Sequence, residues 1–191
     1  MSLRNALLGL LNYRPRTGYD LKKVFEDSIG FYWTVQISQI YNQLNKLEEN
    51  ELIKSDIQLE GKRCTRKVYK ITKDGKKAFL NWVHKFPKQL TEPIRSEFLM
   101  HITFSSKIKL DELIYEINRY KKEQEEMIEA LKRVSQVVQN YKKSNQYSYA
   151  NETFYWDLII KKGFKNSRSN ISWVHECLRL IDERKREEKD E

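Results

Sequence analysis

Glycine, proline and cysteine are scarce in this sequence of 191 residues, with six, three and two copies. Antiparallel β proteins need many turn residues, so this scarcity indicates a mainly α chain. The two cysteines, Cys64 and Cys177, form no CxxC or Cys/His cluster, which gives no support to a disulfide framework or a metal site. We interpret both as inert side chains in a reducing cytoplasm, with a redox switch as the alternative.

Long apolar runs are absent as well. No stretch approaches the roughly 20 apolar residues of a membrane-spanning helix, and no signal-peptide pattern opens the sequence. We therefore expect a cytoplasmic protein without a membrane partner. No glycine-rich phosphate loop occurs, and His84, His101 and His175 are scattered without catalytic spacing. The sequence predicts that the protein is not an enzyme and has no catalytic residues, metal or cofactor.

Basic residues outnumber acidic ones, 36 to 27, which gives a formal net charge of +9. The excess is concentrated in residues 62–77, where eight lysines and arginines face one acidic side chain, Asp74. A cluster this dense indicates contact with a polyanion, and nucleic acid is a stronger candidate than an acidic membrane surface. A solvated basic hairpin explains the same charges and stays open at this point.

The spacing of apolar residues predicts three short helices within the first 50 residues. The second helix follows a capping box formed by Thr17 and Asp20, and the third has an apolar stripe from Ile37 to Leu47. The other face of the third helix is rich in uncharged amides, and it consists of Gln36, Gln39, Asn42, Gln43 and Lys46. Because amide side chains can pair with adenine in the major groove, this face is a candidate for base recognition.

A basic β-hairpin is predicted next. Residues 52–59 and 65–72 are rich in β-branched and apolar side chains, and a turn at 60–62 separates them. Three helices followed by such a hairpin form a winged helix-turn-helix with a two-stranded wing, whose cations contact phosphates. A fourth helix is expected over 78–86. We expect a DNA-binding domain over residues 1–86 and a C-terminal helical dimerisation domain over residues 92–186.

The second half carries a heptad pattern. A helix over 92–103 is expected to precede one long helix over 108–143, with apolar seam residues in steps of three and four and one polar seam position, Gln124. That seam needs a partner, which is a second copy of the chain, its own C-terminal helices, or both. Further helices are expected over 151–162, ended by Gly163, and from Ile171 onward, with a loop at 166–170.

The first half contains three motifs in order, namely Thr17-Gly-Tyr-Asp-Leu21, the stretch from Trp33 to Glu48, and Arg66-Lys-Val-Tyr-Lys-Ile-Thr72 with Gly75. Together they resemble the PadR family of bacterial transcriptional regulators. The resemblance covers residues 1–85, and the rest is similar to the longer branch of the family, which has a virulence-regulator type of C-terminal helical domain. Thr34, Gln36 and Asn42 depart from the family pattern at the recognition helix, so no DNA sequence preference carries over.

The resemblance implies a homodimeric repressor that binds double-stranded DNA at a pseudo-palindromic operator and is released by a small hydrophobic or phenolic effector. It also implies that the Tyr41 hydroxyl reaches a phosphate. The alternative is a coiled-coil adaptor that binds proteins without reading DNA. Aromatic residues that could line an effector pocket are Trp33, Phe86, Phe98, Phe104, Tyr120, Phe154 and Trp156, although ordinary core packing explains each of them better.

Two sets of candidate site residues follow from these arguments. The residues expected to contact DNA are Thr34, Gln36, Ser38, Gln39, Tyr41, Asn42, Gln43, Lys46, Lys62, Arg63, Arg66 and Lys67. The residues expected to form the dimer seam are Leu110, Leu113, Ile117, Tyr120, Gln124, Met127, Leu131, Val134 and Val138.

Overall fold

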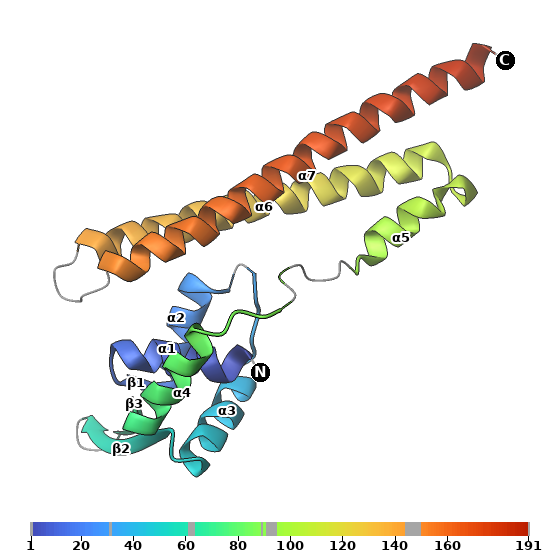
Figure 1. Ribbon diagram of the computed structural model, residues 1–191. Helices are drawn as coiled ribbons and strands as arrows, with labels where there is room; N and C mark the ends of the chain where they lie inside the picture. Colours follow the sequence, from blue (N-terminus) through green and yellow to red (C-terminus); the bar gives the residue numbers. More distant parts are fainter. Residues whose placement is uncertain are drawn as a thin grey trace. The chain divides into compact units, whose positions relative to one another are not determined.

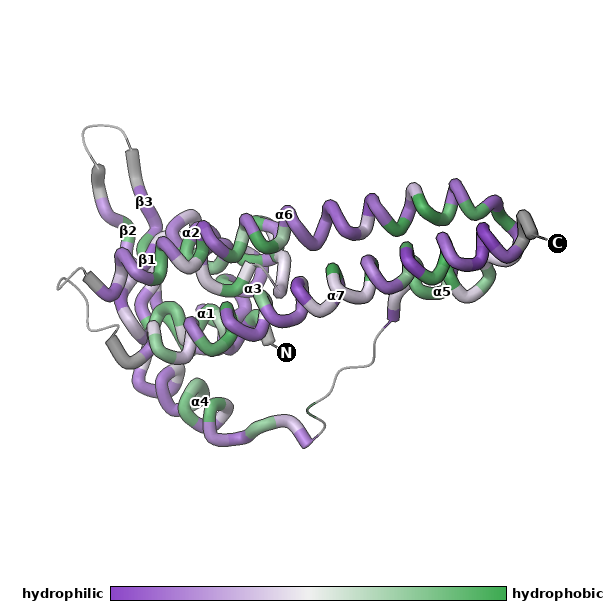
Figure 2. Tube along the Cα trace, turned by 90° about the horizontal axis from the view of Figure 1, so that it is seen from above, coloured by the Kyte–Doolittle hydropathy of each residue, from purple (hydrophilic) through white to green (hydrophobic). Residues whose placement is uncertain are grey.

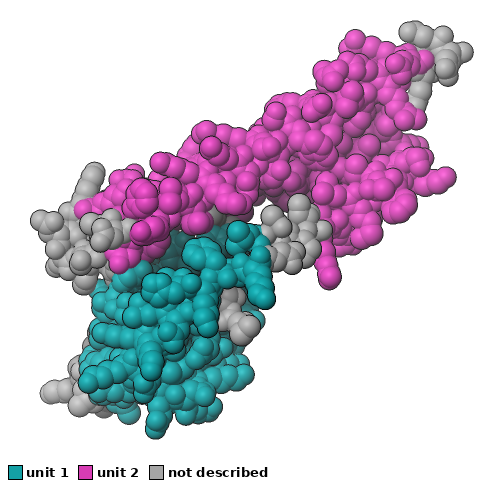
Figure 3. Space-filling view, in the orientation of Figure 1, with its two compact units in different colours: residues 1–92 teal, residues 93–191 magenta. Residues whose placement is uncertain are grey.

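A computed structural model describes residues 2–30, 32–60, 64–88, 90, 95–143 and 150–190. Contacts within the chain divide it into two compact units, residues 1–92 and 93–191, which Figure 3 shows in different colours. We call them the winged unit and the helical unit and describe each by itself.

In its described residues, the winged unit contains four helices and a small antiparallel sheet (Figure 1). Its elements in chain order are α1 (Ser2–Tyr13), β1 (Arg16–Thr17), α2 (Gly18–Ser28), α3 (Ile37–Glu49), β2 (Ile53–Glu60), β3 (Cys64–Ile71) and α4 (Lys73–Val83). The predicted mainly helical fold with an N-terminal winged helix-turn-helix is confirmed. The sheet differs from the prediction in having three strands, in the order β1-β3-β2, because Arg16 and Thr17 pair with Tyr69 and Val68.

Local sequence signals account for the ends of these helices. Thr17 caps α2 as predicted, since its hydroxyl oxygen accepts from the Asp20 amide at 3.1 Å and the Asp20 carboxylate accepts from the Thr17 amide. Thr72 caps α4 in the same way by accepting from the Gly75 amide at 3.0 Å. This cap starts α4 at Lys73, five residues earlier than predicted, and α4 ends at Val83 rather than at Phe86.

A single hydrophobic core holds the winged unit together. The core side chains of the three helices meet Ile53 and Tyr69 of the sheet, and they are Leu7, Leu8, Leu10 and Leu11 of α1, Leu21, Val24 and Phe25 of α2, and Ile40, Leu44 and Leu47 of α3. All of these side chains are at most 7% exposed. Burial of each large apolar side chain contributes roughly 1.5–3 kcal/mol, so this cluster fixes how α3 is presented.

The helical unit consists of α5 (Glu97–Thr103), the short 3₁₀ helix η1 (Ser105–Lys107), α6 (Leu110–Lys143) and α7 (Ala150–Asp190). Figures 1 and 2 both show α6 and α7 lying side by side along most of their length. There are thus two long helices where one was predicted. The α5 helix begins at Glu97, capped by Ser96, instead of at residue 92, and residues 92–94 lie outside the described part.

Gly163 does not end a helix, and the predicted loop at 166–170 is wrong, because α7 is continuous from Ala150 to Asp190. The reason is a seven-residue repeat of buried side chains across that segment, at Thr153, Ile160, Ser167 and Val174. Packing of this repeat against α6 outweighs the roughly 1 kcal/mol that a glycine costs inside a helix. Among the described residues, no helix is long and apolar enough to cross a membrane.

Candidate nucleic-acid interface

The α3 helix presents a polar face to the outside. Ile40, Leu44 and Leu47 are buried in the core at 1% exposure or less, which turns the opposite side outward. That outward side consists of Ser38, Gln39, Tyr41, Asn42, Asn45 and Lys46, all of them exposed. Glu49, also exposed, follows on the same side in the last turn. Residues 38–46 of this side carry amides, hydroxyls and one cation, a composition suited to base edges and phosphates.

Asn45 belongs to this face and is absent from the residues predicted to contact DNA. It follows Asn42 by three residues and Ser38 by seven, so helical spacing alone places it with them. Gln43, which was predicted to contact DNA, is half-buried at the edge of the face, and Thr34 is exposed ahead of the helix.

The first turn of α3 uses one of its amides internally. The Gln36 backbone amide donates to the side-chain Oε1 of Gln39 at 2.9 Å. This bond satisfies a backbone donor at the start of the helix. In this conformation the NH₂ group of Gln39 keeps both of its donors for a base, and its Oε1 keeps one lone pair.

Tyr41 is held against the start of α2. A Cβ atom added to Gly18 would lie 2.5 Å from Tyr41 Cε1 and 2.9 Å from its hydroxyl oxygen. The absence of a side chain at Gly18 therefore makes room for the tyrosine ring. Tyr41 is 40% exposed, so it is both packed on α2 and accessible from outside.

The wing cations have unequal surroundings. Lys67, predicted to contact phosphate, forms an ion pair with Glu48 of α3 at 2.7 Å. Arg66 is exposed and belongs to the opposite face of β3, where Lys70 pairs with Asp56 at 2.6 Å. The other two predicted wing contacts, Lys62 and Arg63, lie outside the described residues.

The predicted dimer residues lie along α6, and several of them pack within the chain. Ile117, Leu131 and Val138 are buried at 1% exposure or less in the unit where α6 packs on α7. Gln124 accepts a hydrogen bond at 3.0 Å from Asn170 of α7. Leu110, Leu113, Tyr120 and Val134 are half-buried, and Met127 is 37% exposed. The internal α7 helix is thus a partner of this seam.

Apolar side chains also remain exposed on the far side of α7. Phe154, Tyr155, Leu158 and Ile159 recur at i, i+1, i+4 and i+5 and are between 42% and 62% exposed. We call these four residues the α7 apolar stripe. A stripe of this kind is a candidate protein-binding surface.

The aromatic residues proposed to line an effector pocket mostly pack in separate clusters. Trp33 packs on Phe25 in the winged unit, with ring centroids 5.4 Å apart. In the helical unit, Phe98 stacks on Tyr120 at 4.5 Å, and Trp156 packs on Tyr141 at 6.1 Å. These four candidate residues pack on other aromatic rings, although Phe98 also lines a second pocket of about 560 Å³ together with Phe104. Phe86, Phe104 and Phe154 are between 58% and 83% exposed and do not belong to a core.

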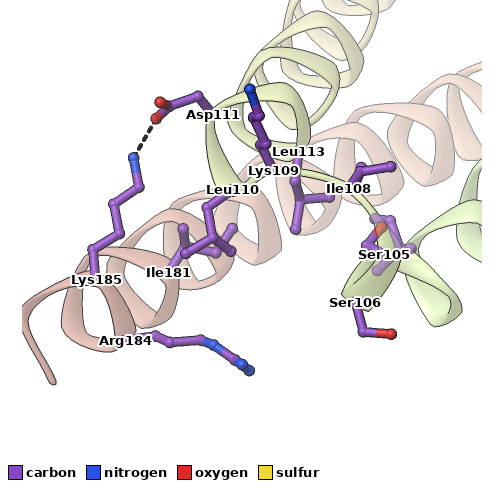
Figure 4. Close-up of a pocket in the computed structure, with 11 residues that line it drawn as sticks. Ser105, Ser106, Ile108, Lys109, Leu110, Asp111, Leu113, Ile181, Arg184 and Lys185 are labelled. Atoms are coloured by element: carbon purple, nitrogen blue, oxygen red, sulfur yellow. Dashed lines mark hydrogen bonds and ion pairs between the residues drawn. The ribbon is translucent and has the colours of Figure 1, made fainter. Parts of the chain in front are cut away.

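A pocket lies at the end of the helical unit where α5, η1, α6 and α7 meet (Figure 4). Its volume is about 910 Å³, and Ile102, Ile108, Leu110, Leu113 and Ile181 give it an apolar lining. Figure 4 shows Asp111 of α6 and Lys185 of α7 pointing toward one another as an ion pair at its edge. Lys109 and Arg184 add positive charge to the same lining.

Cys177 is half-buried in the helical unit. Burial, with Glu176 nearby, raises the pKa of its thiol, which disfavours the reactive thiolate at neutral pH. No group of three or more metal-ligating side chains occurs among the residues that the structure covers.

Together, the outward amide face of α3, the basic wing and the helical unit define a winged-helix DNA-binding protein with an appended helical domain. Comparison with known proteins narrows the class. The model of the "Transcriptional regulator PadR-like family" matches residues 7–81, and that of "Virulence activator alpha C-term" matches residues 94–182. The chain belongs to the PadR-like family and is a DNA-binding transcriptional regulator rather than an enzyme.

Relatives of known character agree with this assignment. The chain is 26% identical over 184 residues to the negative transcriptional regulator PadR of Bacillus subtilis, covering 94% of this chain and 97% of that one. The crystal structure of B. subtilis PadR with operator DNA has a TM-score of 0.80 at 23% identity, with 95% and 99% of the two chains covered. A second structure of that protein, with p-coumaric acid, has a TM-score of 0.71 at 24% identity over 95% and 99%. At these identities the two structures show a shared fold.

Proposed function

We propose that the protein is a homodimeric repressor that acts in the cytoplasm at a pseudo-palindromic operator. The observation that carries this proposal is the exposed, amide-rich face of α3 on a winged domain. Two α3 helices of a dimer would enter successive major grooves about 34 Å apart. The relative in B. subtilis, a negative regulator seen with operator DNA, supports the same mode of action.

The proposed DNA contacts divide into two kinds. Base edges are read by Gln36, Gln39, Asn42 and Gln43, and we add Asn45 because it is exposed on the same side of α3. Phosphates are contacted by the Tyr41 hydroxyl, Lys46 and Arg66, with Lys62 and Arg63 of the wing tip extending the set. Thr34 and Ser38 lie at the edge of the base-reading group. The first kind carries sequence information and the second fixes register on the duplex.

Binding to the DNA upstream of the gene for this protein tests the proposal, with a scrambled duplex measured beside it across a salt series. We expect tight binding to the upstream duplex alone, a steep salt slope and two protomers per site. Asn42→Ala should weaken that binding roughly tenfold, since a base contact is worth about 1–3 kcal/mol. The matched control Asn118→Ala, on α6, should leave it unchanged. Equal, weak binding to both duplexes would contradict operator recognition at that site.

The second copy in the proposed dimer docks on the helical unit through the α7 apolar stripe. Contact between four exposed apolar side chains and water is unfavourable. Covering them with a second apolar surface lowers the free energy. The predicted seam residues that stay partly exposed on α6, such as Met127, enlarge the same unit's apolar surface.

Leu158→Lys tests this interface. It places a charge in the middle of the stripe, so the variant should be monomeric at micromolar concentration while its helix content is retained. Ser169→Lys is the matched control, because Ser169 is eleven residues further along the same outward side of α7 and is exposed. Sedimentation equilibrium distinguishes the two species. A monomeric wild-type chain would contradict the homodimer, and a dimer without operator binding would favour the coiled-coil adaptor.

The finer proposal for regulation is release by a small phenolic or hydrophobic effector. The pocket of Figure 4 suits an aromatic carboxylate, because an apolar floor lies beside the cationic Lys109 and Arg184. Thermal unfolding with p-coumaric acid tests this, and p-cresol, which lacks the carboxylate, is the control ligand. We expect p-coumaric acid to raise the melting temperature and Lys109→Glu to reduce the rise. No shift with any phenolic acid would contradict this effector class.

A further inference from the structure

A single carboxylate joins the recognition helix to the wing. Glu48 stands in the last turn of α3, and its two oxygens accept from two different strands. One oxygen accepts from the Ser55 hydroxyl of β2, and the other accepts from Lys67 Nζ of β3 at 2.7 Å. We call this three-residue contact the helix–wing link.

The register of the sheet places the two donors on one side of the wing. Ser55 pairs with Tyr69 and Ile57 pairs with Lys67, so these four side chains share a face. Tyr69, 2% exposed, is part of the core, which anchors that face. Lys67 Nζ lies 5.2 Å from the centroid of the Tyr69 ring and is therefore bound to a carboxylate and a ring together.

In the helix–wing link, Glu48 and Lys67 each stabilise the charged form of the other. The hydrogen bond from Lys67 is the main cause that lowers the pKa of Glu48, and the same bond raises the pKa of Lys67. The side chains are 44% exposed for Lys67 and 31% for Glu48, so solvent screens the pair without removing it. Charge-assisted hydrogen bonds of this kind restrict geometry as well as adding energy.

We propose that Glu48 and Lys67 are positioning residues for DNA recognition: they hold the wing at a fixed place against α3, and Lys67 acts through Glu48 instead of through a phosphate. Phosphate contacts set the register in which a recognition helix meets the bases. If the wing is fixed to the end of α3, its phosphate contacts also fix where the amide face of α3 meets the bases. If the wing is loose, its phosphate contacts leave the position of α3 undetermined. The inference rests on the proposal that α3 reads bases, and it assigns Lys67 a different role from the phosphate contact expected from its charge.

The sign of the Glu48→Gln effect separates the two roles. If Lys67 served as a phosphate contact, Glu48→Gln would release it and remove a negative charge near DNA, and affinity would rise. If the helix–wing link positions the wing, Glu48→Gln weakens binding to a preferred duplex by about three- to tenfold, the scale of one partly exposed charged hydrogen bond. Binding to a scrambled duplex should change less than twofold on the same grounds.

The probe is a duplex enriched from a random library by the wild-type full-length chain, measured beside a scrambled duplex. Lys67→Met should lower the preference for the enriched duplex as Glu48→Gln does, with the salt slope unchanged. The matched control Lys46→Met, at an exposed cation of α3, should reduce the slope by about 0.9 and weaken both duplexes alike. The exchange Glu48→Lys with Lys67→Glu keeps the net charge and should restore the preference relative to either single change.

Several outcomes would overturn the inference. These are a gain of affinity in Glu48→Gln, a reduced salt slope in Lys67→Met, or no recovery in the exchanged pair. Hydrogen exchange of the core strands confirms that each variant is folded, so a loss of preference in a folded variant reports positioning. A wild-type chain that enriches no duplex would contradict the proposed function itself, which distinguishes that failure from failure of this inference.

Discussion

Three helices and a sheet of the winged unit converge on one cluster of buried side chains, whereas the helical unit has a single seam between two helices. The buried apolar side chains of that seam are Ile117, Leu131, Val138, Ile160 and Val174, and polar groups alternate with them. The winged unit covers its own core on several sides. The helical unit leaves the four side chains of the α7 apolar stripe exposed.

This difference suggests a division of labour. A unit with a closed core can present a rigid polar face, and α3 presents one. In the helical unit, α6 and α7 bury one side of each other and α5 adds Phe98 to that packing, which leaves the far side of α7 with exposed apolar side chains. The polar seam groups Gln124 and Asn170 cost stability compared with apolar residues but favour one alignment of the helices. The comparison predicts that substitutions will be severe in the winged unit and milder in the helical seam.

The largest expected effect is that of Gly75→Ala in the winged unit. A Cβ there would lie 2.0 Å from the carbonyl oxygen of Leu52, which is backbone and cannot move aside. We expect a loss of about 3 kcal/mol in the free energy of unfolding of this unit. Gly9→Ala is the control, because its Cβ would lie 2.9 Å from the ring of Phe79, a side chain that can shift.

Urea unfolding followed by hydrogen exchange measures both changes segment by segment. Gly9→Ala should cost about 1 kcal/mol, and neither variant should alter exchange in α6 or α7. If both variants lost the same free energy of unfolding, a Cβ against the Leu52 backbone would cost no more than one against the Phe79 ring. A loss in the helical unit as well would show that the two units unfold together.

The next effect is that of Gln124→Leu in the seam of the helical unit. It removes the acceptor of the Asn170 side-chain amide and should cost about 1–2 kcal/mol. Gln124→Leu combined with Asn170→Leu removes both polar groups and should recover most of that loss. Thermal unfolding of the single and double variants gives the coupling, and strictly additive losses would contradict a mutual hydrogen bond.

A smaller effect, on DNA binding more than on stability, is expected for Gly18→Ala. The added Cβ would displace the Tyr41 ring from α2 and with it the Tyr41 hydroxyl. We expect affinity for an enriched duplex to fall about fivefold, which corresponds to the loss of one phosphate contact. The free energy of unfolding should fall by less than about 1 kcal/mol. Tyr41→Phe should give a similar fall without steric change. If Gly18→Ala left affinity unchanged, Tyr41 would not be a DNA contact.

Much of the winged unit was predictable because its signals are local. The Thr17–Asp20 capping box and the stripe of α3 each span few residues, and the structure contains both. The third strand was not predictable, because Arg16 and Thr17 pair with residues more than 50 positions away. Asn45 could have been found, since helical spacing from Asn42 places it on the same face.

The helical unit and the wing cations show where local reasoning fails. Gly163 carries a local stop signal, yet the repeat of Ile160, Ser167 and Val174 against α6 continues the helix. Charge alone also does not distinguish a phosphate contact from an ion pair. Lys67 has its carboxylate partner 19 residues earlier, in a different element, and only the tertiary fold brings the two together.

Acid titration compares two ion pairs, one in each unit, and is the smallest expected effect. Hydrogen bonds from Lys67 and Lys185 lower the pKa values of Glu48 and Asp111 respectively below their ordinary values. A carboxyl with a lowered pKa stabilises the folded state above its unfolded-state pKa, and this contribution disappears as pH falls through the lower folded-state pKa. Both pairs should therefore weaken in acid.

The size of the loss should differ because the surroundings differ. Glu48 has two hydrogen-bond donors and is 31% exposed, whereas the side chain of Asp111 is 85% exposed and solvent screens its pair. Between pH 7 and the onset of acid unfolding, Glu48→Gln should flatten the stability profile of the winged unit more than Asp111→Asn flattens that of the helical unit. Equal flattening would show that the second donor and the lower exposure of Glu48 add nothing, and the helix–wing link would then be no stronger than an ordinary surface pair.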